Sequence, residues 1–557
     1  MEQGRIILAI ALSFLVFLVW DYFFIEKIPP EQHLTEQQEA AQSSPVDEKI
    51  PAKTPPPTET PTPLQPSTPI AETTQAPEGA REILIKTPLY EATISEKGAV
   101  ITSFTLMDYR EEVDPDAPLK ALVSPDNRLG TLWAGLSEVP GDSVRGYYRT
   151  DAPLDTITID GEVQSLNFIW RSPQGVLVEK RFTFQPDSYV IDYDVTVKNN
   201  GSAPFQDRLA VTLTQAGADA PRGYGFVGPS GYIDGRLEQI KPKEFDEKGN
   251  LTGKIDWAAI QDRYFMKAVL PKTDQNSTMR LAVQDETVMT NTLFTGMETF
   301  NPGSEKSFFY QAYIGPKSLK ILNEMGGSLV RAVNFGMFDI LAKPCLWVMN
   351  FIYDNLISNY GVAIILLTLM TKIILWPLGQ KSYKSMNAMK KLQPLMTEIR
   401  EKYKDDKQRQ NQEMMALYRT YKVNPMGGCL PMLLQIPVFF ALYRMLYEAI
   451  ELRHAPFFGW INDLSAPDRL FSLGVAIPFM EPPYGIPVLT LIMGATMLLQ
   501  QKMQPPMGDA TQAKMMMLMP VIFTFIFINF SAGLVLYWLT NNVLSIGQQY
   551  YTQKKLA

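Results

Sequence analysis

The stretch Ala363–Met386, AIILLTLMTKIILWPLGQKSYKSM, gives the clearest indication of how the C-terminal half of the chain is organised. Its apolar run is long enough to enter a bilayer, because a membrane helix needs about 20 predominantly apolar residues. One charge, Lys372, lies inside this run, and the chain becomes basic immediately after Pro377. The stretch therefore predicts a membrane helix that carries a cation near one end and is followed by a basic segment.

Further apolar segments on both sides have the length of membrane spans. Ile6–Phe24 follows Arg5, ends in aromatic residues and lacks a small-residue cleavage site, so we predict that residues 1–27 form an uncleaved anchor. The other segments are residues 358–377, 426–447, 485–503 and 515–550. The last is too long for one crossing and is interrupted at Asn529–Gly533, so we expect two helices there and six spans in total.

The charges of the connecting segments orient these spans. Residues 378–425 contain 11 Lys and Arg against 5 Asp and Glu, whereas residues 448–484 contain two arginines against five acids. Lys and Arg accumulate on the cytoplasmic side of a membrane. The parts predicted to be cytoplasmic are therefore the N-terminus, residues 378–425, the loop 504–514 and the tail 551–557.

The chain between the anchor and the C-terminal half has two characters. Residues 28–80 are rich in Pro, Thr, Gln and Glu, a composition that cannot bury a core, so we predict a disordered tether. Residues 81–317 consist of short alternating segments between turns such as Lys97-Gly98 and Pro173-Gln174-Gly175. This texture predicts a large all-β sandwich, which the anchor places outside the cytoplasm.

Two segments of the C-terminal half are amphipathic. Residues 318–356 hold Asp339, Lys343 and Pro344 close together, which disfavours a membrane span and predicts a helix region lying on the outer surface of the membrane. Residues 378–425 have apolar residues at 3–4 spacing on both sides of a polar turn, which predicts a helical hairpin whose first arm Pro394 breaks or kinks. A solvated hairpin near anionic lipid and a docking arm for ribosomes, targeting factors or incoming chains both fit this pattern.

The chain of 557 residues is poor in residues for catalysis and metal binding. It has two histidines, His33 and His454, and two cysteines, Cys345 and Cys429, without metal-ligand spacing. No hydrolase triad and no nucleotide-binding loop can be recognised. We therefore predict no catalytic residue, no metal and no cofactor. The mild net charge of −7 argues against a dedicated nucleic-acid binder, so no recognition of a nucleic-acid sequence is expected.

The predicted spans contain neutral polar residues and one cation. Lys372 has no Asp or Glu in the middle of any span as a counterpart, which disfavours a proton-coupled transporter. The residue lies roughly 7–8 Å from the end of its span, so its stem could carry the ammonium to the interface. Alternatively, the charge lines a water-filled groove. Six methionines between Met503 and Met519 fit a flexible substrate surface or ordinary packing.

Three long motifs resemble the core of the YidC/Oxa/Alb family of membrane protein insertases: Thr371–Pro394, Asn424–Leu446 with NPMGGCLPMLLQIPVFFALYRML, and Met519–Asn542. The order of parts is similar to the Gram-negative form of that family, with the five-helix core at residues 357–550. This resemblance implies a non-enzymatic insertase of the bacterial inner membrane. Its partners would be nascent membrane proteins, ribosomes and targeting factors at the hairpin and tail, the Sec translocon and membrane lipids.

The resemblance also implies a substrate groove in this chain. The candidate groove residues are Lys372, Thr368, Gln435 and Asn542, and the candidate substrate contacts are Ile436, Pro437 and Met516. The family's cation is commonly an arginine, whereas a lysine keeps the charge but lacks the planar guanidinium. The β domain resembles a sugar-mutarotase-like supersandwich, but residues 81–320 contain no histidine, so we expect no sugar catalysis.

Two other functions compete with the insertase. A channel or transporter would need a continuous polar path or repeated halves around a central site, and neither can be recognised in the sequence. A periplasmic scaffold would need only its β domain. Ion or solute flux through liposomes would favour the first, and loss of all activity on deletion of residues 81–310 would favour the second.

Overall fold

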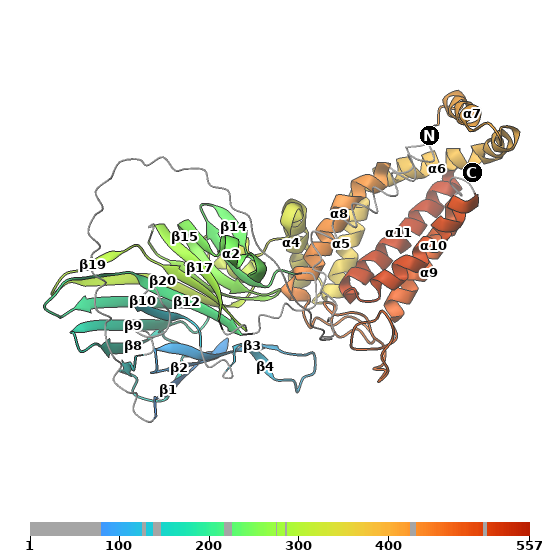
Figure 1. The fold of residues 1–557 in the computed structure, drawn as a ribbon. Helices are drawn as coiled ribbons and strands as arrows, with labels where there is room; N and C mark the ends of the chain where they lie inside the picture. The colour runs from blue at the N-terminus through green and yellow to red at the C-terminus, as the bar shows by residue number, and fades with distance from the viewer. Residues whose placement is uncertain are drawn as a thin grey trace, which may run out of the picture. The chain divides into compact units, whose positions relative to one another are not determined.

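The computed structural model describes residues 79–556, apart from 125–129, 137–145, 217–224, 274–275, 285–286, 424–429 and 505–509. The predicted anchor, nearly all of the predicted tether and Cys429 lie outside the described residues. The described residues form a β domain over Glu82–Pro316 and a helical part over Leu319–Leu556 (Figure 1). An all-β domain followed by a helical core is the predicted fold class.

The β domain is built from 20 strands within the described residues. Their bounds are β1 Glu82–Lys86, β2 Tyr90–Ser95, β3 Val100–Arg110, β4 Leu119–Val123, β5 Trp133–Leu136, β6 Arg149–Thr150, β7 Thr156–Thr158, β8 Gln164–Arg171, β9 Val176–Phe184, β10 Val190–Asn199, β11 Phe205–Asp207, β12 Leu209–Ala216, β13 Gly228–Ile233, β14 Arg236–Gln239, β15 Asn250–Gln261, β16 Phe265–Pro271, β17 Asn276–Gln284, β18 Val288–Phe294, β19 Glu298–Phe300 and β20 Glu305–Pro316. A 3-10 turn, η1 (Pro242–Glu244), and α2 (Phe245–Lys248) connect β14 to β15.

These strands form three sheets. The first has the order β4-β3-β2-β1-β7, and the second the order β5-β12-β18-β17-β15-β16-β20-β10-β9-β8-β6, with β13 and β14 attached through β15. Strands β11 and β19 form a small third sheet. Only β7 against β1 is a parallel pair among the pairs of the described strands. The prevalence of antiparallel neighbours follows from the short turns that join consecutive strands.

The turns that the sequence predicts connect strands in the structure. Lys97-Gly98 lies between β2 and β3, and residues 173–175 lie between β8 and β9. Gly175 has φ +86°, a conformation that residues with a Cβ rarely adopt, and a Cβ there would lie 2.9 Å from the backbone nitrogen of Gly201. Glycine is therefore required for this turn. Strand β9 begins at the next residue, and its side chains are alternately buried and more exposed.

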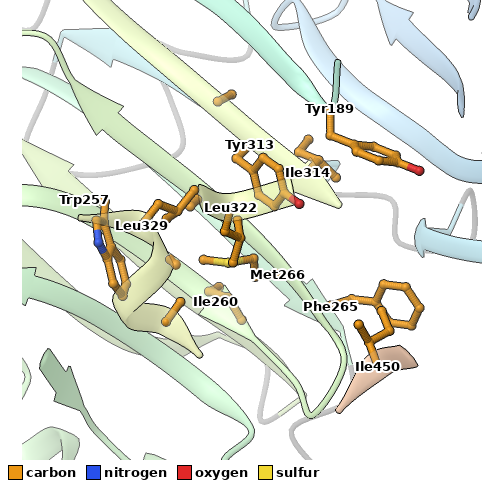
Figure 2. Packing of buried hydrophobic residues seen from close by; sticks show 14 of the residues in the cluster. Tyr189, Trp257, Ile260, Phe265, Met266, Tyr313, Ile314, Leu322, Leu329 and Ile450 are labelled. Atoms are coloured by element: carbon orange, nitrogen blue, oxygen red, sulfur yellow. The ribbon is translucent and has the colours of Figure 1, made fainter. Parts of the chain in front are cut away.

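The core of the β domain extends beyond the strands. Helix α3 (Leu319–Glu324) and the 3-10 turn η2 (Leu329–Ala332) place Leu322 and Leu329 in the same buried cluster as Trp257 and Met266. Figure 2 shows Leu322 beside Met266 and Leu329 beside Trp257. Burying one leucine stabilises the fold by about 1.5–3 kcal/mol. The predicted interfacial region 318–356 is therefore divided, and its first part packs against the β domain.

The second part of that region is the amphipathic helix. After η3 (Gly336–Phe338), helix α4 covers Asp339–Asn355 and contains Pro344. Ala342, Leu346, Met349 and Ile352 are buried at helical spacing, whereas Ile340 and Trp347 are 81% and 67% exposed. Asp339 and Lys343 form an ion pair of 2.6 Å one turn apart. One face of α4 is thus packed against α5 and α8, and the other is exposed and apolar.

The remaining helices follow the predicted apolar segments and the basic segment 378–425. They are α5 Tyr360–Ile374, α6 Trp376–Lys402, α7 Lys407–Thr420, α8 Leu430–Glu448, α9 Val488–Met503, α10 Ala510–Phe527 and α11 Ala532–Leu556, with the 3-10 turn η5 Ile450–Leu452 after α8. The run 515–550 is divided into two helices at residues 528–531, as predicted. Helix α11 contacts α5, α6, α8 and α9, and α10 contacts α9 (Figure 1).

The two prolines of the motif Thr371–Pro394 both lie in α6, so the predicted break of the first arm at Pro394 is wrong. Pro377 stands in the first turn of α6, where its missing N–H is not needed, so it begins a helix instead of ending one. Pro394 lies inside α6, which continues through it to Lys402. No helix in the described part of the chain is by itself long and apolar enough to cross a membrane. The pair α5 and α6, bent by 65°, meets that criterion together.

Helices α6 and α7 form the predicted hairpin. Leu392 and Met396 of α6 are buried, and the hydroxyl of Tyr418 in α7 lies 3.9 Å from the sulfur of Met396. Asp406 caps the N-terminus of α7 by accepting a hydrogen bond from the backbone N–H of Arg409. The apolar spacing in the sequence therefore marks the faces by which the two arms pack.

Candidate functional site

Lys372 lies in the last turn of α5, opposite a polar stretch of α11. Its Nζ donates a 2.6 Å hydrogen bond to Oγ of Ser545 and a 3.4 Å hydrogen bond to Oδ1 of Asn541. The side chain is half-buried. The ammonium is thus directed across to the neighbouring helix and is held there by two contacts, in contrast to a side chain extended along its own helix towards the interface.

Both acceptors are oriented to receive a cation. The hydroxyl of Ser545 donates its proton to the backbone oxygen of Asn541 over 2.6 Å, so its lone pairs face Lys372. Oδ1 of Asn541 also accepts from Nε2 of Gln435 on α8, over 3.3 Å. Hydrogen bonds to a charged group contribute about 1.5–3 kcal/mol each. These groups stabilise the charge of Lys372 without neutralising it.

No carboxylate neutralises this cation among the described residues. The only acid within the bounds of α5, α8, α9, α10 and α11 is Glu448, at the far end of α8, where it pairs with Arg444 over 2.8 Å. An ammonium has three N–H donors, and the two named contacts occupy two of them. The site can therefore accept one further electronegative group, and a carboxylate would be the preferred one.

Helix α11 carries two polar pairs that are seven residues apart. Asn541 faces Lys372, whereas the amide of Asn542 donates to Oγ1 of Thr496 on α9 over 3.3 Å. Two turns later, Gln548 donates to the backbone oxygen of Trp376 at the α5–α6 bend, over 3.1 Å. Its neighbour Gln549 donates to the backbone oxygen of Met503 on α9, over 2.9 Å. One residue of each pair thus faces the lysine side of α11, and the other faces α9.

The predicted groove residues are only partly brought together. Gln435 joins Lys372 through Asn541. Thr368 is buried, one turn before Lys372, and its hydroxyl donates to the backbone oxygen of Ile364 in its own helix. Asn542 is placed against α9 and takes no part in the contacts of Lys372.

The predicted substrate contacts lie on two helices. Ile436 and Pro437 follow Gln435 on α8 and are exposed. Met516 lies on α10 and is half-buried between the exposed residues Met515 and Met517. Exposed apolar side chains therefore adjoin the polar residue Gln435 on one helix, whereas no described contact links Met516 to Lys372.

Several members of the site are not predicted by the sequence. They are Ser545 and Gln548 of α11 and Tyr383 of α6, whose hydroxyl donates to the backbone oxygen of Ser545 over 3.4 Å. A signal was present, because Asn541, Ser545, Gln548 and Thr552 follow each other at intervals of four, three and four residues. That spacing places them on one face of a helix.

The β domain contains two lysines of a different kind. Lys180 is fully buried, donates a 2.5 Å hydrogen bond to the backbone oxygen of Gly98, and has its Nζ 4.3 Å from the ring centre of Tyr148. Lys267 donates to the backbone oxygen of Thr214 over 2.7 Å. Burial disfavours the charged form and lowers the pKa of each lysine to about 7. In the part of the chain that the structure describes, no three His, Cys, Asp or Glu side chains are grouped to hold a metal.

Comparisons with known proteins cover both halves of the chain. Residues 351–557 match the family model described as 60Kd inner membrane protein, and residues 82–348 match the YidC periplasmic domain. The chain is similar to membrane protein insertase YidC of Syntrophus aciditrophicus, with 40% identity over 99% of both chains. It is 41% identical to the insertase of Syntrophobacter fumaroxidans, over 99% of this chain and 100% of that one.

Solved structures give a weaker likeness. An active YidC insertase with its first transmembrane domain resolved is 20% identical and has a TM-score of 0.37, over 86% of this chain and 95% of that one. A putative aldose 1-epimerase from Escherichia coli K12 is 10% identical, with a TM-score of 0.31 over 42% of this chain and 99% of that one.

Proposed function

The chain belongs to the YidC family of membrane protein insertases, and from this premise we propose that it moves hydrophobic segments of nascent membrane proteins into the inner membrane through a hydrated groove at Lys372. The relatives named above are inner membrane insertases with a periplasmic domain. The single observation that supports a groove at this place is a half-buried lysine that has neutral partners and no acid among the described residues.

The proposed mechanism is physical, without a covalent step. A polar outer segment of a substrate costs several kcal/mol to place in hydrocarbon. A polar, positively charged recess partway through the membrane shortens the apolar distance that this segment must cross. Lys372 attracts acidic residues of the segment with its remaining N–H donor. Asn541 and Ser545 hold the ammonium in place while the substrate comes and goes.

The apolar part of the substrate leaves by a different route in this proposal. Ile436 and Pro437 on α8 are exposed, and so are Ile373 and Ile374 beside Lys372 on α5. A hydrophobic helix can lie against such a surface without hydrogen-bonding requirements and then pass sideways into lipid. The flexible thioethers of Met515, Met516 and Met517 on α10 would accommodate many sequences.

The experiment exchanges the charges on both sides of the proposed contact. Lys372→Arg should retain insertion, because the positive charge remains. Lys372→Glu should lower the insertion of a client with an acidic outer segment about tenfold, which corresponds to about 1.4 kcal/mol. Both variants are measured by protease protection of a client inserted into proteoliposomes.

A matched client provides the control. When Asp and Glu of its outer segment are replaced by Asn and Gln, insertion should depend far less on residue 372. If Lys372→Glu inserts the acidic client as well as the unchanged protein does, Lys372 only joins α5 to α11, and the proposal is wrong.

We further propose that the α6–α7 hairpin and the tail bind ribosomes and targeting factors on the cytoplasmic side, and that the insertase acts alone or with the Sec translocon. Both ends of the chain are cytoplasmic in this proposal. Among the many exposed cations of the hairpin, Lys390 and Lys391 lie on α6 and Arg419 lies on α7. Replacing these three residues by glutamate should weaken co-sedimentation with ribosomes that translate a membrane protein severalfold. Unchanged co-sedimentation would leave the alternative of a solvated hairpin near anionic lipid.

A further inference from the structure

The segment between η5 and α9, residues 453–487, contains an apolar stretch, here called the tip, that has no role in the proposed function. The tip is Leu470–Met480, LFSLGVAIPFM, and it contains no charged residue. Phe471, Val475 and Phe479 are 69%, 73% and 86% exposed. Single exposed apolar residues are ordinary, but an uncharged run that exposes its largest side chains marks an interaction surface.

The tip is held by a polar clamp at its base. The guanidinium of Arg469 donates to the backbone oxygens of Pro483 and Ile528, over 2.9 and 2.8 Å, and to Oδ1 of Asn529 over 3.2 Å. Asn529 in turn donates to the backbone oxygen of Phe479 over 3.0 Å. The segment is thereby tied to the turn between α10 and α11.

The backbone of the tip is also paired with the residues that follow the tip. Leu470 and Ile486 exchange two hydrogen bonds of 2.8 and 2.9 Å, and the N–H of Leu473 donates to the backbone oxygen of Tyr484 over 2.7 Å. These hydrogen bonds form a short hairpin-like base, from which Phe471, Val475 and Phe479 project.

Two of the exposed residues have an unusual backbone conformation. Phe471 has φ +58° and Phe479 has φ +65°, in the left-handed region that bulky residues avoid. Each such residue costs about 1–2 kcal/mol. Both side chains are directed outwards, so burial in the described structure does not offset this cost. Strain of this kind persists where the exposed geometry has a use.

The neighbouring surface indicates what covers the tip. Phe525 and Ile526 at the end of α10, just before the clamped turn, are 60% and 41% exposed, and Leu491 and Ile492 are exposed in the first turns of α9. In a protein inserted in the inner membrane, exposed apolar helix surfaces of this kind are the ones that lipid can cover. Figure 1 shows residues 453–487 at the end of the helices opposite the α6–α7 hairpin. The apolar tip therefore lies next to the exposed apolar residues at the end of α10 and the start of α9.

We propose that the tip Leu470–Met480 inserts its apolar side chains into the membrane leaflet opposite the basic hairpin. Phe and aliphatic side chains bury favourably at the boundary between headgroups and acyl chains, and the run carries no charge that would oppose insertion to this depth. Arg469 and Glu481, which flank the tip, mark the point at which the chain returns to water. Through Arg469 and Asn529, this anchor fixes the turn between α10 and α11 relative to the bilayer.

The test measures contact with lipid directly. In the full chain with Cys345→Ser and Cys429→Ser, a single cysteine is introduced at Val475 or Phe479 and labelled with an environment-sensitive fluorophore. The protein is reconstituted in vesicles of phosphatidylethanolamine and phosphatidylglycerol. Quenching is measured with lipids that carry a spin label near the headgroup, and separately with aqueous iodide. A cysteine at Val163, an exposed apolar residue of the β domain (59%), is the matched control.

The expected result is severalfold stronger lipid quenching and severalfold weaker iodide quenching at both tip positions than at residue 163. Equal iodide quenching at the three positions would overturn the proposal, because the tip would then lie in water. Protection from iodide without lipid quenching would overturn it as well, because a protein would then cover the tip. Val475→Cys leaves both left-handed phenylalanines in place, so the test does not depend on tolerance of Phe479→Cys.

Discussion

Lys180 in the β domain and Lys372 in the helical core are both lysines without an acidic partner among the described residues, yet their surroundings differ. Lys180 is fully buried and is held by a backbone oxygen and the face of a tyrosine ring. Lys372 is half-buried and is held by two side chains of a neighbouring helix. A fully buried lysine such as Lys180 has only a structural role. A half-buried lysine such as Lys372, which keeps an N–H donor accessible, can also bind a substrate.

We expect the largest effect when Lys180, the buried lysine of the β domain, is replaced. The pKa of Lys180 is lowered to about 7 in the folded state, whereas a lysine in the unfolded chain titrates near 10.4. Between these two values the unfolded state binds more protons, so stability rises as the pH rises from about 7 towards 10. Lys180→Met should reduce this rise by a few kcal/mol, measured by thermal unfolding of the β domain in the full chain at several pH values.

The control for this prediction is Lys198, on the exposed side of β10 in an ion pair with Glu305. Lys198→Met removes a lysine that is not fully buried, so it separates the effect of burial from that of losing a lysine side chain. Because the pKa of Lys267 is also lowered to about 7, part of the rise should remain in Lys180→Met and become smaller when Lys267→Met is added. A pH dependence that is equal in all variants would show that neither buried lysine titrates as expected.

We expect a smaller effect when a residue that holds Lys372 in the helical core is replaced. Adjacent asparagines of α11 provide a matched pair, because Asn541 accepts from Lys372 and Asn542 donates to Thr496. Asn541→Ala should lower the insertion of an acidic client severalfold and reduce the difference between acidic and neutral clients. Asn542→Ala should lower thermal stability by about 1 kcal/mol and leave that difference as it is. Equal client selectivity in both variants would mean that the contact with Asn541 does not position the ammonium.

The sequence predicts most of the fold because its local signals agree with the tertiary structure. Glycine and proline mark turns such as Pro173-Gln174-Gly175, and alternation marks the strands that follow. Asn529–Gly533 divides the long apolar run where α10 ends and α11 begins. The roles of proline were harder to predict. Pro377 can end one helix or begin the next, and Pro394 is tolerated inside α6.

The candidate site was predicted less completely than the fold. Lys372 and Gln435 could be found as polar residues in apolar runs, but Ser545 and Tyr383 lie in parts of the sequence where polar residues are common. Their importance arises from the packing of α11 against α5 and α6, which no local pattern specifies. The same holds for Leu322 and Leu329, whose spacing fits a membrane-surface helix as well as it fits the core in which they are buried.

The contacts of the paired polar residues of α11 depend on the number of residues in this helix. Consecutive residues of a helix are about 100° apart, so one residue inserted near Ala532 would turn every later side chain away from its present neighbour. Asn541 and Gln548 would leave the lysine side, and Asn542 and Gln549 would leave α9. An insertion of seven residues, nearly two full turns, would restore both directions but would move each pair about 10 Å along the helix axis, away from Lys372 and Thr496. Helix α11 can thus vary in composition more freely than in residue number.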